Sequence, residues 1–134
     1  IVFGDWSSDV CSSDLDTIED EARALQWSFW VMSEVESALL SVLMHSRVLP
    51  ADRRDPEKVS RNRGLLKGPF SILDQTLADH EFLAGNRFTV ADLNVAAVLS
   101  WCKPARLPLA DYPHLDAWLR HCLERPARKA AQLA

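Results

Sequence analysis

One short stretch, residues 86 to 101, constrains the fold more than any other part of the chain. It reads NRFTVADLNVAAVLSW. Thr89 is a good N-cap residue, and Asp92 follows it by three positions, which is the spacing of a capping box. Phe88 and Leu93 stand at the two positions of the hydrophobic staple that often accompanies such a box. The stretch therefore predicts a helix that begins after Thr89 and has its first N–H groups satisfied from within the chain.

The helix predicted after Thr89 is apolar on several sides, through Val90, Ala91, Val95, Ala96, Val98 and Leu99. A helix of this kind is typical of the centre of a domain. Because N–H groups at a buried helix start cannot turn to water, they need an internal acceptor. Catalysis is the competing interpretation for Asp92, but the capping role already accounts for the residue. We therefore expect Phe88, Thr89, Asp92 and Leu93 to be structural.

A first long helix is expected from Thr17 to about Arg47, before Pro50. Thr17 and Asp20 again have capping-box spacing, and acidic residues follow at the positive end of the helix dipole. At about 100° per residue, five large apolar side chains share one broad face of this helix. We expect that face to be core: it carries Leu25, Phe29, Met32, Leu39 and Leu43.

Further helix starts are marked by proline at a first-turn position. Asp55 and Pro56 open a second helix, which should pass Pro69 with a kink rather than a break. Tyr112 and Pro113 open another helix after the central one, and Pro126 opens a short last helix. No stretch alternates as a strand would. The predicted fold class is all-α, a helical bundle with two long antiparallel helices first.

Residues 1–15 differ in character from the rest, since Ser-Ser-Asp occurs twice around Val10 and Cys11. Such a stretch has no period and little to bury, which predicts disorder. It is either a flexible tail or translated sequencing-adapter read-through, and in the second case the natural N-terminal part is missing. Residues 16–134 are treated as one helical domain.

Charge and cysteine content exclude several classes of protein. A net charge of -4 argues against binding to nucleic acid or to an anionic membrane surface. No apolar run reaches the roughly 20 residues of a membrane span, and no signal peptide is recognisable. Cys11, Cys102 and Cys122 are widely spaced and form no CxxC pair. This pattern predicts free thiols in the cytoplasm and no metal site.

Two phrases carry a resemblance to a known family. FLAGNRFTVADLNVAAVLSW and, later, YPHLDAWLRHCLERPARKAA resemble the C-terminal helical domain of cytosolic glutathione transferases. In that family G-x-x-F-T-x-A-D opens the buried central helix, and Y-P-x-L-x-x-W-L-x-x-x-x-x-R-P follows it. The first motif spans Gly85 to Asp92 here, and the second spans Tyr112 to Pro126. The resemblance covers about residues 17 to 134.

The resemblance implies a parent enzyme that transfers glutathione thiolate to hydrophobic electrophiles or uses it for reduction. Family members carry an N-terminal thioredoxin-like domain, which supplies most of the glutathione site and the residue that activates the thiol. This chain shows no βαβ pattern, so no catalytic residue can be carried over, and alone it is expected to be inactive and to hold no cofactor. Its implied partners are that missing domain and a second subunit in a homodimer. The alternative is a non-catalytic docking module, as in translation-factor subunits.

One stripe of the first long helix could face a cleft or another subunit, within a sector of about 80°. It holds Trp27, Trp30, Glu34, Ala38, Ser41 and His45. A surface stripe whose tryptophans pack on their neighbours explains it equally well. The resemblance implies that Glu34 reaches the amino group of glutathione across a dimer. It also implies that Met44 and His45 line the substrate pocket, with Trp27 and Trp30 as further contacts. For His45, a cation at the helix C-terminus is the simpler role.

Overall fold

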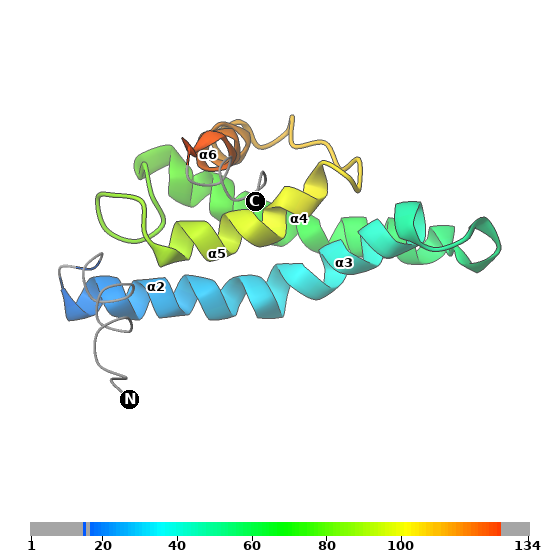
Figure 1. Ribbon diagram of the computed structural model, residues 1–134, viewed down its shortest axis with the longest axis horizontal. Helices are drawn as coiled ribbons and strands as arrows, with labels where there is room; N and C mark the ends of the chain where they lie inside the picture. The colour runs from blue at the N-terminus through cyan, green and yellow to red at the C-terminus, as the bar shows by residue number, and fades with distance from the viewer. Residues whose placement is uncertain (1–14, 16, 127–134) are drawn as a thin grey trace.

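The computed structural model describes residues 15 and 17–126, and in this part of the chain it contains helices and no strand. The predicted all-α class is confirmed. Figure 1 shows one long helical rod with the remaining helices stacked on one side of it. In that stack α5 lies along the rod, and α6 lies furthest from it. Among the described residues, nothing therefore covers the opposite long side of the rod.

The rod is the first long helix, and it runs without interruption from residue 18 to residue 48. It comprises α2 (Ile18–Val31), a π-helical turn η1 (Met32–Glu36), α3 (Ser37–Leu43) and a second π-helical turn η2 (Met44–Val48). Thr17 caps its start, since Thr17 Oγ1 accepts from the backbone N–H of Asp20 at 3.1 Å. At its end the Arg54 guanidinium donates to the carbonyls of Leu49, at 2.7 Å, and Arg47, at 3.0 Å.

The expected core face of this helix is wrong in its first half. Leu25, Phe29 and Met32 are 54%, 67% and 59% exposed, whereas Leu39 is fully buried. The helical period itself holds along the rod, because the buried positions are spaced by seven, four, three and four residues: Ala24, Val31, Val35, Ala38 and Val42. The physical reason is that small and β-branched side chains form the core face, which lies about 90° from the predicted one. The larger apolar side chains, on which the prediction relied, lie outside that face in the first half of the helix.

The remaining helices are α4 (Pro56–Asp79), α5 (Val90–Leu99) and α6 (Pro113–Glu124), with short 3-10 turns at Ala51–Arg53 and Ser100–Cys102. Asp55 caps α4 by accepting from the N–H groups of Glu57 and Lys58. The helix continues through Pro69. Apart from Pro126 itself, the expected last helix lies outside the described residues.

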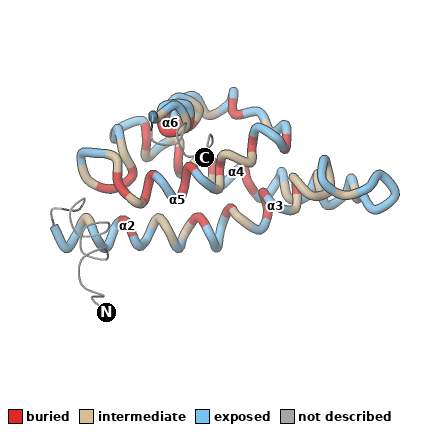
Figure 2. Tube along the Cα trace, in the orientation of Figure 1, coloured by how far each residue is buried: buried red, intermediate tan, exposed pale blue. Residues whose placement is uncertain are grey.

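The core lies where the helices meet (Figure 2). Its largest fully buried side chains include one or more leucines from each of α3, α4, α5 and α6, namely Leu39, Leu66, Leu73, Leu99 and Leu115. Burying such a side chain contributes about 1.5–3 kcal/mol. Leu15 also packs against this core, although the sequence assigned it to the tail; the predicted disorder of residues 1–14 lies outside the described residues.

The start of α6 takes its cap from another helix. Its own N-cap residue, Tyr112, makes no side-chain cap. Instead Asp74 Oδ1 of α4 accepts from the backbone N–H groups of His114, at 2.8 Å, and Leu115, at 3.0 Å. The carboxylate also stands at the positive end of the α6 dipole. One side chain thus fixes the position of α6 on α4.

Candidate functional site

The predicted capping box is present at the start of α5. Thr89 and Asp92 each bond to the other's backbone, with the Thr89 N–H donating to Asp92 Oδ2 at 3.0 Å. Thr89 Oγ1 also accepts from the Ala91 N–H at 3.3 Å. Both residues are buried, Asp92 completely. The helix start thus has acceptors inside the protein, where water cannot supply them.

Asp92 does more than the sequence predicts. Its other carboxylate oxygen, Oδ1, accepts from the backbone N–H of Leu83 and from Trp118 Nε1, both at 3.0 Å. One buried carboxylate therefore joins α5 to α6 and to the loop before α5. The signal for this was Trp118, because a tryptophan on the inner face of a helix needs an acceptor for its N–H. A carboxylate so fully occupied is not free for acid–base chemistry.

The two staple residues differ from expectation. Phe88 packs against the core, and the Arg125 guanidinium lies 3.8 Å from the centre of its ring. Leu93 is 56% exposed, and Asn94 and Ala97 beside it are exposed as well. The predicted central helix therefore has one face that no described element covers.

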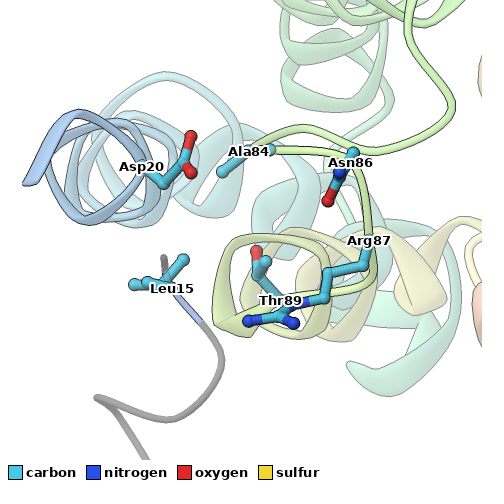
Figure 3. Close-up of a pocket in the computed structure, with 7 residues that line it drawn as sticks. Leu15, Asp20, Ala84, Asn86, Arg87 and Thr89 are labelled. Carbon is cyan, nitrogen blue, oxygen red and sulfur yellow. The ribbon is translucent and has the colours of Figure 1, made fainter. Parts of the chain in front are cut away.

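The loop before α5 forms a small recess against the start of α2 (Figure 3). Leu15 and Asp20 line one side, and residues 84–87 with Thr89 line the other. Gly85 has φ of 72°, in the left-handed region that side chains disfavour. Its α-carbon also faces the Asp20 carboxylate, whose nearest atoms would lie 3.6 Å from an added Cβ. The glycine of the first motif is thus required by the backbone.

Met44 and His45 lie on the π turn η2, at the far end of the rod, and both are half-buried. The Nδ1 atom of His45 is buried and has no hydrogen-bond partner in the described part of the chain. Such an atom in a native structure needs an explanation, for example a bound water or ligand. Glu34 lies on the other π turn, η1, with its side chain exposed. Both predicted ligand contacts thus occupy π turns, which are frequent at functional sites.

The structure does not bring the two tryptophans to Met44 and His45. Trp27 and Trp30 are half-buried on α2 and pack edge to face, with ring centres 5.2 Å apart and planes at 81°. At 1.5 Å per residue, Trp27 and Met44 are separated by about 25 Å along the rod. One small ligand cannot contact both pairs. Ala38 of the same predicted stripe is buried.

Large apolar side chains are exposed on α2 and on the neighbouring helix α5. They are Leu25, Phe29 and Met32 from α2 together with Leu93 from α5, each more than half exposed. Asn94 Nδ2 donates to Ser28 Oγ at 3.0 Å, which holds the two helices side by side at this point. We call these four residues the α2–α5 apolar surface. Contiguous apolar surfaces rimmed by polar groups mark interaction sites.

The two described cysteines, Cys102 and Cys122, are buried free thiols. Burial raises the pKa of each to about 12. They are therefore poor nucleophiles at neutral pH. No cluster of three potential metal ligands forms among the described residues, and no helix there is long and apolar enough to cross a membrane.

Comparison with known proteins agrees with this geometry. Residues 32–126 match the family model described as glutathione S-transferase, C-terminal domain. Glutathione S-transferase GstB of Escherichia coli (strain K12) is 26% identical over 113 residues, which cover 84% of this chain and 54% of the relative. Elongation factor 1-gamma of Carassius auratus is 27% identical over 118 residues, covering 85% of this chain and 26% of the relative.

Solved structures show the same likeness. Glutathione S-transferase-I bound with the ligand lactoylglutathione superposes with a TM-score of 0.77 at 26% identity, covering 85% of this chain and 56% of that chain. The chain spans about half the length of the glutathione S-transferases it matches. The family model matches most of the chain, including both sequence motifs. The chain therefore belongs to the glutathione S-transferase family and corresponds to its C-terminal helical domain.

Proposed function

We propose that this chain is the helical half of a cytoplasmic glutathione transferase that conjugates glutathione to hydrophobic electrophiles or reduces substrates with it. In this proposal a thioredoxin-like domain docks on the α2–α5 apolar surface. The observation that carries the proposal is that surface, since three large side chains of α2 and Leu93 of α5 lie in water in the described chain. A domain of the same protein that covered them would bury them at about 25 cal/mol per Å² of apolar area.

The electrophile pocket, in the same proposal, forms at the η2 end of the rod. Met44 would supply a flexible thioether that adapts to varied apolar substrates. His45 would bring its unpartnered Nδ1 to the same pocket, as an acceptor for a substrate donor group. Trp27 and Trp30 are excluded from this pocket by their distance along the rod.

Glu34 is proposed to bind the amino group of glutathione held by the partner subunit of a homodimer. Its carboxylate is exposed on η1, and among the described residues no cation forms an ion pair with it. A carboxylate paired with an ammonium forms a charge-assisted hydrogen bond. One exposed pair contributes roughly 0–1 kcal/mol, whereas even millimolar affinity needs about 4 kcal/mol. The chain alone should therefore bind glutathione weakly and catalyse no conjugation.

The test compares the chain alone with a fusion that carries the thioredoxin-like domain of a relative such as GstB. Glutathione binding is measured by calorimetry, and turnover is measured with a generic aromatic electrophile. The chain alone should remain at the background rate, and the fusion should exceed it. In the fusion, Glu34→Gln should weaken glutathione binding about threefold, while the matched variant Glu36→Gln on the same turn leaves it unchanged. Turnover by the chain alone would refute the proposal.

A second candidate function is a non-catalytic docking module, favoured by the similarity to elongation factor 1-gamma. In that case the α2–α5 apolar surface would still bind a domain, but no glutathione site would form. The same fusion separates the two functions. A folded fusion that neither binds glutathione nor turns over an electrophile would favour the docking module.

A further inference from the structure

An open groove lies along one flank of the first half of α4. Its lining residues are spaced so that they share one face of the helix, and they are Pro56, Val59, Ser60, Arg63, Gly64 and Lys67. The groove encloses about 710 Å³ of space that is open to solvent. The rod packs on another face of α4, where Asn62 Nδ2 donates to Ser41 Oγ at 3.1 Å. The groove shares no residue with the α2–α5 apolar surface or with the proposed electrophile pocket.

The groove is positively charged and contains no acid. Arg63 and Lys67 are both exposed and stand four positions apart, which places their like charges on neighbouring turns. No acidic residue lines the groove, and none stands three or four positions from either cation along α4. Neither side chain forms an ion pair with an acid in the part of the chain that the structure describes. The two cations are therefore available to an acid from outside the described chain, although the net charge of the whole chain is -4.

Gly64 lies between the two cations and leaves space above the helix backbone. A Cβ at this position would meet no atom within 4 Å, so packing within the described chain does not require a glycine. Glycine in a helix interior destabilises the helix relative to alanine, and like charges four positions apart destabilise it further. Proteins depart from such local preferences mainly at functional sites. A glycine here allows the backbone of a partner to approach closely.

The shape of the groove favours a helix as its occupant. Because α4 is itself a helix, it offers no strand edge with which an extended segment could pair. A helix satisfies its own backbone hydrogen bonds and can lie along α4 without such pairing. Its side chains recur at the spacing that separates Arg63 from Lys67. A small anion would form only one or two exposed ion pairs, which contribute little.

We propose that this groove docks an acidic helix of a partner protein, separately from the proposed glutathione and electrophile sites. Two carboxylates four positions apart on that helix pair with the Arg63 guanidinium and the Lys67 ammonium group. A small side chain between them lies over Gly64, and an apolar side chain contacts Pro56 and Val59. Charge complementarity selects an acidic helix over a neutral or basic one.

The test measures how the full chain binds a fluorescein-labelled, alanine-based helical peptide with glutamate at every fourth position, by fluorescence anisotropy at low salt. A peptide with glutamine at the same positions should bind about tenfold more weakly. The variant Arg63→Glu, Lys67→Glu should reduce binding of the acidic peptide by at least about tenfold. The matched variant Lys58→Glu, Arg61→Glu changes the charge of the same helix equally, but neither residue lines the groove. It should change binding by less than about threefold.

A second pair of variants tests the close approach at Gly64. Gly64→Leu should raise the midpoint of chemical denaturation, because leucine favours a helix and has open space at this position. It should nevertheless weaken peptide binding about tenfold, because the new side chain occupies the space that the partner helix needs. Gly68→Leu makes the same change one turn further along α4, also in open space but outside the groove. It should raise the midpoint and leave binding unchanged.

Four outcomes would overturn the proposal. Equal binding of the glutamate and glutamine peptides, or no binding of either at millimolar concentration, would mean that the groove does not select an acidic helix. Equal losses in the two charge-reversal variants would show an effect of overall charge. A membrane surface would be the occupant if the chain bound phosphatidylglycerol vesicles and the Arg63→Glu, Lys67→Glu variant did not. A second copy would be the occupant if that variant changed the sedimentation of the chain alone.

Discussion

The start of α5 and the outer side of α2 differ in whether their side chains find partners within this domain. At the start of α5 the buried polar side chains have partners: the Asp92 carboxylate accepts from Leu83, Thr89 and Trp118 while fully buried. On the outer side of α2 large apolar groups have found none, since Phe29 and Met32 are 67% and 59% exposed. A buried polar group without a partner is far more costly than an exposed apolar one.

The difference distinguishes interactions that this chain forms by itself from a surface that only a partner could cover. The polar network is closed within residues 83–118, so it should stabilise the chain in any context. The α2–α5 apolar surface contributes nothing until something covers it. Substitutions at the two places should therefore differ sharply in their effect on the free energy of unfolding, and the following experiments measure that difference.

The largest effect is expected for Asp92→Ala. The substitution leaves the N–H groups of Leu83, Thr89 and Trp118 buried without their acceptor, and each such loss costs about 1–3 kcal/mol. We expect the free energy of unfolding to fall by about 3–5 kcal/mol, as measured by chemical denaturation. Asp116→Ala is the matched control, because Asp116 forms only the exposed ion pair with Arg120 and should change stability by less than about 1 kcal/mol. Similar midpoints for the two variants would refute the network.

A smaller effect is expected for Thr89→Ala. This variant loses the Thr89 Oγ1 bond to Ala91 but keeps the Asp92 carboxylate, so the loss should be about 1–2 kcal/mol. The double variant Thr89→Ala, Asp92→Ala should lose less than the sum of the single losses, since both act on one motif. Strict additivity in a double-mutant cycle would mean that the two side chains act separately.

The buried thiols predict a dependence on alkaline pH. The pKa of Cys102 and that of Cys122 are raised from 9.0 to about 12 by burial. A raised pKa in the folded state means stability that is complete below pH 9 and is lost as the pH rises toward 12. In denaturation at a series of alkaline pH values, the variant Cys102→Ala, Cys122→Ala should start less stable but decline less. An equal decline in both proteins would assign the alkaline loss to other groups.

The smallest effect is expected on the outer side of α2. Phe29→Ser should change the free energy of unfolding of the chain alone by no more than about 0.5 kcal/mol, because the ring lies mostly in water. In the fusion with a thioredoxin-like domain, the same substitution should weaken the contact between domains, measured as separate rather than joint unfolding transitions. A large loss in the chain alone would show that Phe29 already packs on something within it.

Local chemistry allowed much of this structure to be predicted. The helix starts at Thr17, Asp55 and Thr89 followed from side chains that bond to nearby N–H groups, which is a short-range effect. The core face of the first helix was predicted wrongly, because alanine and valine form it while larger apolar side chains such as Phe29 and Met32 lie outside it.

The candidate site was less predictable, because it depends on contacts between residues that are distant in sequence. The large separation between Trp27 and Met44 depends on their distance along the rod and on which elements pack beside it. The bond from Trp118 to Asp92 joins residues 26 positions apart, and no local pattern specifies such a contact. Residues 23–27 and 76–85 likewise line one open groove, although these two segments are distant in sequence.

The closeness in sequence of the partners of Asp92 has a consequence for how the domain forms. Leu83, Thr89 and Trp118 stand 9, 3 and 26 positions from Asp92. Bringing them together closes only short loops, and the entropy of closure rises with loop length. Contacts of short and moderate sequence separation lower the contact order, which favours fast folding. The segment from Leu83 to α6 should therefore assemble first, and its amide hydrogens should exchange with solvent more slowly than those on the uncovered side of α2.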